Sequence, residues 1–76
     1  MSRHNWKPWI DALISNMKFG EVWTVFEMIS EIRYMSAGYL DWNLFEDPAV
    51  RKSIRTLLAR DRRLERVGYG KYGRII

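Results

Sequence analysis

The sequence has 76 residues, 47% of them hydrophobic, no cysteine and a formal net charge of +4. A chain of this length supports one compact core, so we expect residues 1–76 to form a single domain. The lack of thiols excludes disulfides and cysteine-ligated zinc, and no apolar run approaches the roughly 18 residues needed to span a membrane. The polar N-terminus has no signal-peptide core, so we expect a cytoplasmic protein (in the host cytoplasm or nucleoid if viral).

The charge is divided unevenly along the chain. Residues 1–47 carry four basic and seven acidic side chains, a net charge of −3. Residues 48–76 carry nine basic and two acidic side chains, a net charge of +7. A basic half on a small folded domain is the electrostatic footprint of a protein that binds a polyanion. We therefore expect the functional surface in the C-terminal half.

The first predicted helix begins after Asn5, whose side chain can cap it, and ends near Met17 or Lys18. Its apolar residues recur at helical spacing, which is typical of a helix with one buried face. These residues are Trp6, Ile10, Leu13 and Met17, with Trp9 and Ile14 beside them. Gly20 then suits a left-handed turn after the helix.

A short extended piece, residues 21–23, separates the first helix from the second. Three residues are too few for an independent strand, but they can pair with a C-terminal hairpin. Thr24 and Glu27 have the spacing of a capping box, in which each side chain satisfies a free N–H group. The second helix is therefore predicted to begin there and to end near Met35. Its inward residues are Val25, Met28, Ile29 and Ile32.

The stretch from Tyr39 to Glu46 is too apolar for a solvated loop. Its large apolar residues are Tyr39, Leu40, Trp42, Leu44 and Phe45. We favour a loop folded onto the core. The alternative is an exposed apolar patch that binds a partner protein, joined by an exposed Trp6 or Trp9.

The third predicted helix runs from Pro48 to about Arg60. Asp47 is a good N-cap, and proline at the first helical position loses no hydrogen bond. Val50, Ile54, Leu57 and Leu58 recur at helical spacing and form an apolar stripe. The opposite face carries Lys52, Arg55, Thr56 and Ala59, with Arg51 on its flank. A face with three cations and no acid differs from ordinary helix surface, which mixes charges of both signs.

Strand-like residues follow the third helix and predict a hairpin. They are Leu64, Val67 and the pair Ile75–Ile76. Glycines 68, 70 and 73 flank the turn between them, so we expect a basic, glycine-rich tip at residues 68–73.

The order helix, short strand, helix, helix, strand, strand resembles the winged-helix family of DNA-binding domains. The resemblance covers most of the chain, from about Trp9 to Ile76, and implies an α+β fold. The triplet Ser53-Ile54-Arg55 followed by Leu58 also resembles the recognition helix of forkhead domains. The resemblance implies that helix 48–60 lies in the major groove and that the wing, residues 68–73, lies on the adjacent groove or backbone. The long segment between the second and third helices departs from the tight turn of many bacterial members.

The physical chemistry of the third helix agrees with that placement. Arginine or lysine in the major groove can hydrogen-bond guanine O6 and N7, and only outward residues can reach the bases. Those residues are Lys52, Arg55 and Thr56, with Arg51 near the edge. The cations after the helix suit phosphate contacts, which fix register without specifying sequence. They are Arg60, Arg62 and Arg63.

At the wing, Lys71 and Arg74 supply charge, and Tyr69 or Tyr72 can lie against a sugar. The other interpretation of the tyrosines is cross-strand packing inside the hairpin. Strand alternation directs one of the two inward.

We do not expect an enzyme. His4 is the only histidine and lies near the N-terminus, and most carboxylates fall on predicted helix exteriors or caps. The run Gly68-Tyr69-Gly70-Lys71 lacks the spacing and the strand-to-helix context of a phosphate-binding loop. No metal-ligand set can be assembled. We therefore expect no cofactor and no small-molecule substrate.

The sequence thus predicts sequence-specific binding of double-stranded DNA by a small transcriptional regulator. An origin in a virus, phage or other mobile element is an analogy only. The alternative function is a winged-helix module that binds protein through residues 39–45, and RNA binding through the wing stays open. No helix is left for a dedicated dimer interface, so we expect a monomer or a weak homodimer.

Overall fold

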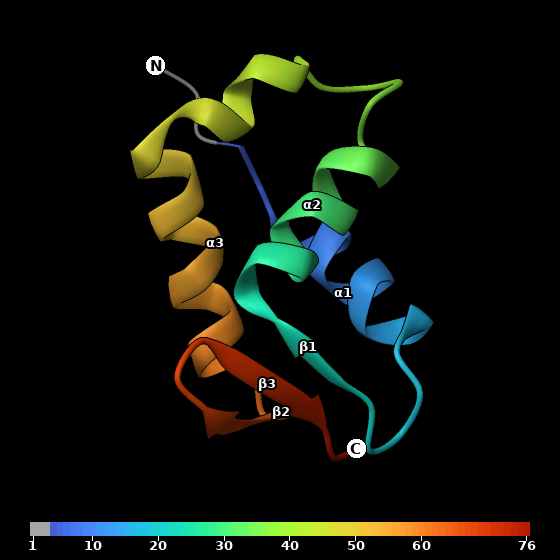
Figure 1. The fold of residues 1–76 in the computed structure, drawn as a ribbon. Helices are drawn as coiled ribbons and strands as arrows, with labels where there is room; N and C mark the ends of the chain where they lie inside the picture. Colours follow the sequence, from blue (N-terminus) through green and yellow to red (C-terminus); the bar gives the residue numbers. More distant parts are fainter. Residues whose placement is uncertain (1–3) are drawn as a thin grey trace.

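The computed structural model describes residues 4–76 and contains three α-helices, one 3₁₀-helix and a three-stranded sheet (Figure 1). The elements are α1 (Lys7–Asn16), β1 (Val22–Thr24), α2 (Val25–Met35), η1 (Trp42–Glu46), α3 (Pro48–Arg60), β2 (Leu64–Gly68) and β3 (Lys71–Arg74). The predicted α+β class and the order of helices and strands are confirmed. The arrangement is that of a small winged-helix-like domain, with the sheet at one end and η1 at the other.

The sheet has the strand order β1-β3-β2, and both pairings are antiparallel. Trp23 and Arg66 both pair with Tyr72, so the predicted pairing of the short first strand with the hairpin is confirmed. The register shifts between Arg66 and Gly68, which makes a bulge. β3 ends at Arg74, before the isoleucine pair that was expected to belong to it.

The predicted caps of α2 and α3 are confirmed. At α1 the N-cap is Trp6, which forms no side-chain cap bond, and Asn5 Oδ1 accepts from the Lys7 N–H at 3.2 Å. The Thr24 hydroxyl accepts from the Glu27 N–H at 3.1 Å, and the Glu27 carboxylate accepts from the Thr24 N–H at 2.9 Å. The second bond favours the ionised carboxylate and holds the pKa of Glu27 below its ordinary value. At α3, the Asp47 carboxylate accepts from the Ala49 N–H at 2.9 Å. Gly20 has a φ of 81°, as expected for its left-handed turn.

The core lies between the three helices and the inner face of the sheet. Its buried side chains are Trp6, Ile10, Leu13, Ile14, Met17, Met28, Ile32, Phe45, Ile54, Leu58 and Leu64. Trp6 is buried, as predicted for the apolar face of the first helix, and its ring packs edge-on against Phe45 with centroids 5.4 Å apart; it therefore cannot join the exposed patch of the alternative interpretation. The predicted stripe on α3 was wrong at Leu57, which is 38% exposed. Leu57 lies about 60° around the helix from Ile54, at the edge of the buried face.

The apolar segment between α2 and α3 forms the 3₁₀-helix η1 rather than a loop. Asp41 caps it by accepting from the Asn43 N–H at 2.9 Å. Phe45 is buried, and Leu40 and Leu44 pack against the core, so the interpretation of a segment folded onto the core is confirmed for these three. Tyr39 and Trp42 stay 81% and 46% exposed.

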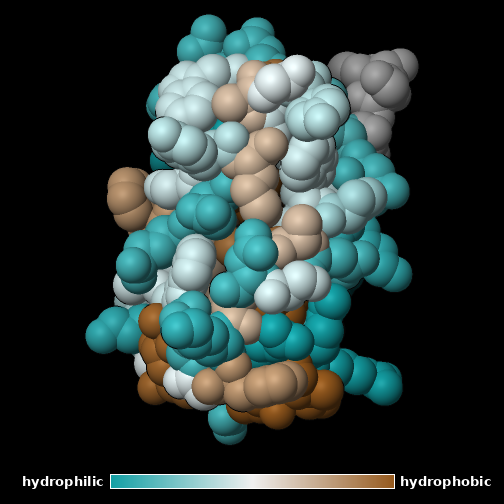
Figure 2. Space-filling model, turned by 90° about the vertical axis from the view of Figure 1, so that its right-hand side faces the viewer, coloured by the Kyte–Doolittle hydropathy of each residue, from teal (hydrophilic) through white to brown (hydrophobic). Residues whose placement is uncertain are grey.

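Apolar side chains also gather on the surface at the sheet end of the molecule (Figure 2). The exposed apolar residues of this end are Phe19, Val22, Val67, Ile75 and Ile76. Gly73 lies between two of them, since a Cβ added there would lie 3.5 Å from Val22 and 3.6 Å from Val67. The sheet therefore has an apolar outer face as well as a buried inner one.

Candidate nucleic-acid interface

The outer face of α3 carries the predicted DNA-reading residues Arg51, Lys52, Arg55 and Thr56, which we call the α3 face. All four are exposed. Among the described residues, their charged groups form no ion pair. The Thr56 hydroxyl donates to the Lys52 carbonyl at 2.9 Å, so it offers a ligand its acceptor lone pairs.

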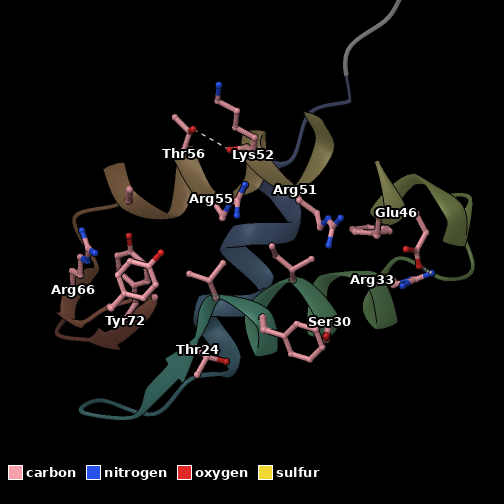
Figure 3. Close-up of a pocket in the computed structure, with 17 residues that line it drawn as sticks. Thr24, Ser30, Arg33, Glu46, Arg51, Lys52, Arg55, Thr56, Arg66 and Tyr72 are labelled. Carbon is pink, nitrogen blue, oxygen red and sulfur yellow. Dashed lines mark hydrogen bonds and ion pairs between the residues drawn. The ribbon is translucent and has the colours of Figure 1, made fainter. Parts of the chain in front are cut away.

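A groove of about 860 Å³ runs beside this face, between α2, α3 and the hairpin. Its α3 wall holds Arg51, Lys52, Arg55, Thr56 and Ala59; its α2 wall holds Thr24, Val25, Phe26, Ile29, Ser30 and Arg33; its ends hold Phe45, Glu46, Arg66, Tyr69, Gly70 and Tyr72. Figure 3 shows Arg51 and Arg55 turned into the space between the two helices, whereas Lys52 and Thr56 project away from α2. The α3 face thus has a part inside the groove and a part on its outer rim.

The charged side chains that line the groove are nearly all basic. Five basic side chains line it, together with a single carboxylate, that of Glu46. Glu46 is paired with Arg33 at 3.0 Å, and the Arg33 guanidinium also stacks on the Trp42 ring at 4.1 Å. The other four cations, three turned to the groove and Lys52 on its rim, have no neutralising acid among the lining residues. Such a concave cationic surface attracts a polyanion.

The hairpin tip differs from a projecting wing. Its turn has two residues, Tyr69 and Gly70, and Gly70 has a φ of 65°. The Val25 N–H donates to the Gly70 carbonyl at 2.8 Å, which ties the tip to the first turn of α2. Tyr69 is 94% exposed, and the Arg66 guanidinium lies 5.9 Å from the centre of its ring.

Strand register decides which hairpin residues face the groove. Tyr72 is half-buried against the core, so of the two tyrosines it is the inward one, as alternation requires. Arg66 pairs with Tyr72, lines the groove and was missed in the predicted site. The pairing of Arg66 with Tyr72 could have identified Arg66 as a groove residue. This pairing cannot be derived from the sequence, because the bulge between Arg66 and Gly68 shifts the strand register. Lys71 precedes Tyr72 on β3. It is exposed and does not line the groove.

Two of the predicted phosphate contacts have partners inside the protein. Arg63 donates to Asp11 and to Asp61, each at 2.7 Å, and lies away from the groove. Its hydrogen bond to Asp61 holds the pKa of that carboxyl below its ordinary value. A guanidinium held by two carboxylates carries little net charge for DNA, so the phosphate contact predicted for Arg63 stays a prediction without structural support.

Arg74 is the second predicted contact that has partners inside the protein. Its Nη1 donates to the carbonyls of Ile14 at 2.9 Å and Met17 at 2.6 Å, and its guanidinium lies 4.5 Å from the centre of the Phe19 ring. These carbonyls lie at the C-terminal end of α1. The Ile14 carbonyl also accepts from the Met17 N–H at 3.0 Å, so Arg74 is its second donor. Arg74 therefore joins β3 to α1 and does not line the groove.

Arg60 and Arg62, the remaining predicted contacts, are exposed and lie outside the groove. Arg60 follows Arg55 by five positions, so the two side chains point about 140° apart around the helix axis. Arg60 thus projects from the flank of α3 that faces away from α2.

Within residues 4–76, no helix is long and apolar enough to cross a membrane. No group of three or more histidine, aspartate or glutamate side chains in that range could hold a metal ion. A scan of protein-family models and searches of curated proteins and solved structures found no match to this chain. Any function must therefore be argued from the site itself.

Proposed function

We propose that the protein binds double-stranded DNA sequence-specifically, as a small transcriptional regulator, with α3 in the major groove. The observation that carries this proposal is the cationic, acid-free α3 face beside a concave cationic groove. An α-helix fits the major groove of B-DNA, and lysine and arginine hydrogen-bond guanine there.

The directions of the side chains support separate roles in contacting bases and phosphates. Lys52 and Thr56 project outward from α3 and are suited to base edges. Arg51, Arg55 and Arg66 line the groove and are suited to a phosphate strand beside the helix. Tyr69 at the exposed tip is suited to a flanking sugar. Because the tip is tied to α2, we propose that the hairpin contacts the backbone next to the helix rather than a distant minor groove.

The test is a titration of the purified protein with duplex DNA of random sequence over a range of salt concentrations. Neutralising phosphates releases counterions, so log affinity should fall linearly with log salt, by about 0.9 per phosphate contacted. Selection from random duplexes should then enrich a preferred site. Single-stranded RNA of equal length is the control, and tighter binding to it would transfer the proposal to RNA. No duplex binding at low salt would contradict the proposal.

The alternative function is a protein-interaction module that docks through residues 39–45. The observation that favours it is the exposure of Tyr39 and Trp42. Leu40, Leu44 and Phe45 contribute to the core, however, and the Trp42 ring is covered on one side by Arg33. Little apolar surface of the segment is left for a partner, so we rank this function second.

A further inference from the structure

The exposed surface of α2 carries two aromatic rings, and the first of them, Phe26, also lines the α2 wall of the groove. Phe26 is 79% exposed and Tyr34 is 77% exposed, although helices normally turn large apolar residues inward. They lie eight residues apart, about two turns, with the small Ser30 between them. The gap forms a shallow hollow of about 350 Å³. We call it the α2 hollow; its lining is Trp23, Phe26, Glu27, Ser30, Glu31 and Tyr34.

The chemistry of the α2 hollow selects a cation. Its lining combines aromatic rings with the carboxylates of Glu27 and Glu31, and it includes no basic residue. The face of an aromatic ring attracts a guanidinium or ammonium group, and a nearby carboxylate adds a charged hydrogen bond. One Glu27 oxygen holds the cap of α2, which leaves the other oxygen for a ligand. An arginine side chain from a partner would cover the exposed rings and pair with Glu31.

The chain itself presents suitable cations on another surface. Arg60 and Arg62 are exposed, and their side chains form no hydrogen bond or ion pair with the part of the chain that the structure describes. The acid between them, Asp61, is already paired with Arg63. Arg60 also projects away from the groove, so a bound polyanion in the groove leaves it accessible.

We propose that the α2 hollow of one copy of this chain binds the Arg60–Arg62 corner of a second copy. The charge complementarity of the two surfaces favours a second copy as the partner. The two surfaces are different parts of the molecule, so the contact is heterologous. A heterologous contact that does not close into a ring yields an open, head-to-tail series. The four residues of the α3 face belong to neither contact surface, so such a series would make DNA binding cooperative.

Self-association is measured without DNA, so its failure leaves the proposed DNA binding untouched. In sedimentation velocity at low salt, the average mass of the parent should rise with concentration past the dimer. High salt should reverse the rise, because it screens exposed charges. A parent that stays monomeric, or that stops at a dimer, overturns the proposal.

Two complementary variants test the contact itself. The hollow variant combines Glu31→Lys with Tyr34→Ala and retains Glu27, which caps α2. The corner variant combines Arg60→Glu with Arg62→Glu. Each keeps one surface and loses the other, so each alone should be monomeric. An equal mixture can form one junction only, and it should stop at a dimer. Growth past the dimer, or no association in the mixture, overturns the proposal.

A charge-matched pair of single substitutions guards against unfolding of the double variants. Arg62→Glu and Lys18→Glu change the net charge equally at exposed positions. Arg62→Glu should weaken association by about tenfold or more, as loss of a charged contact does, whereas Lys18→Glu should leave it unchanged. Equal effects of the two would show a response to net charge alone. If the copies associated through the apolar outer face of the sheet, neither substitution would change the strength of association. Either result overturns the proposal.

Discussion

The sheet end of the molecule and the α3 face both carry basic residues from the same half of the sequence, yet they use them differently. At the sheet end, Arg63 and Arg74 reach α1 across 52 and 60 residues of chain. On the α3 face, Arg51, Lys52 and Arg55 find no such acceptor within residues 4–76. A count of charge treats the two regions alike. The difference lies in whether a carbonyl or carboxylate is within reach.

This difference predicts two separate losses on substitution. Removing an anchored arginine leaves acceptors unpaired and should lower stability. Removing a cation of the α3 face breaks no internal bond, so its effect should appear only when DNA is present. The substitutions below test this separation, beginning with the largest expected effect.

The combined Arg51→Ala, Lys52→Ala and Arg55→Ala variant should lose at least about 100-fold in affinity for the preferred duplex, since each base or phosphate contact is worth about 1–3 kcal/mol. The measurement is fluorescence anisotropy with labelled DNA, repeated over a salt series. The salt slope should flatten, and thermal unfolding should match that of the parent because the removed groups are exposed. A folded variant that binds like the parent would show that α3 does not contact DNA.

Arg74→Ala should destabilise the protein by about 2–3 kcal/mol, because it removes two charged hydrogen bonds to the end of α1. Denaturant unfolding measures the loss. DNA affinity measured well below the unfolding transition should stay within about twofold of the parent. Arg74→Lys is the control, since it keeps the charge but lacks the planar fork and should recover part of the stability. An unchanged stability with a flatter salt slope would restore Arg74 to the DNA interface.

The features that could be predicted from the sequence are local. Thr24 with Glu27, and Asp47 with Pro48, set the starts of two helices from residues within four positions of each other. The cation-rich, acid-free side of α3 likewise follows from spacing within one helix. These signals depend on backbone geometry that the rest of the chain does not change.

The features that could not be predicted depend on contacts between distant segments. No local signal shows that Arg74 meets the end of α1, or that the hairpin tip bonds to Val25. The five-residue η1 is too short for its apolar residues to show a period, and Asp41 as its cap was the available clue. Arg63 lies two residues from Asp61, so half of its pairing could have been predicted from the sequence.

Arg63→Ala should cost about 1 kcal/mol, less than Arg74→Ala, because the Arg63 side chain is 34% exposed and water screens its ion pairs. The loss should depend on pH. Arg63 lowers the pKa of Asp61 in the folded state, so the pair stabilises the fold above the ordinary aspartate pKa of about 3.9. This stabilisation is lost as the pH falls through the lowered value.

Unfolding curves of the parent and Arg63→Ala at a series of pH values measure this dependence. The two stabilities should differ at neutral pH and converge as Asp61 becomes protonated. A difference that stays constant into acid would show that the ion pair with Asp61 does not stabilise the protein.

The smallest expected effect is that of Lys71→Ala, three residues from Arg74 on the same strand. Lys71 is exposed, and among the described residues it has no ion pair, so stability should change by less than about 0.5 kcal/mol. If Lys71 contacts a phosphate, as the sequence predicts, all duplexes should weaken alike and the salt slope should flatten by about one contact. Lys71→Ala and Arg74→Ala should therefore give opposite results in the two assays, although each removes one positive charge from β3. If both variants lower stability, or both change only the salt slope, the distinction between anchored and free cations fails within this strand.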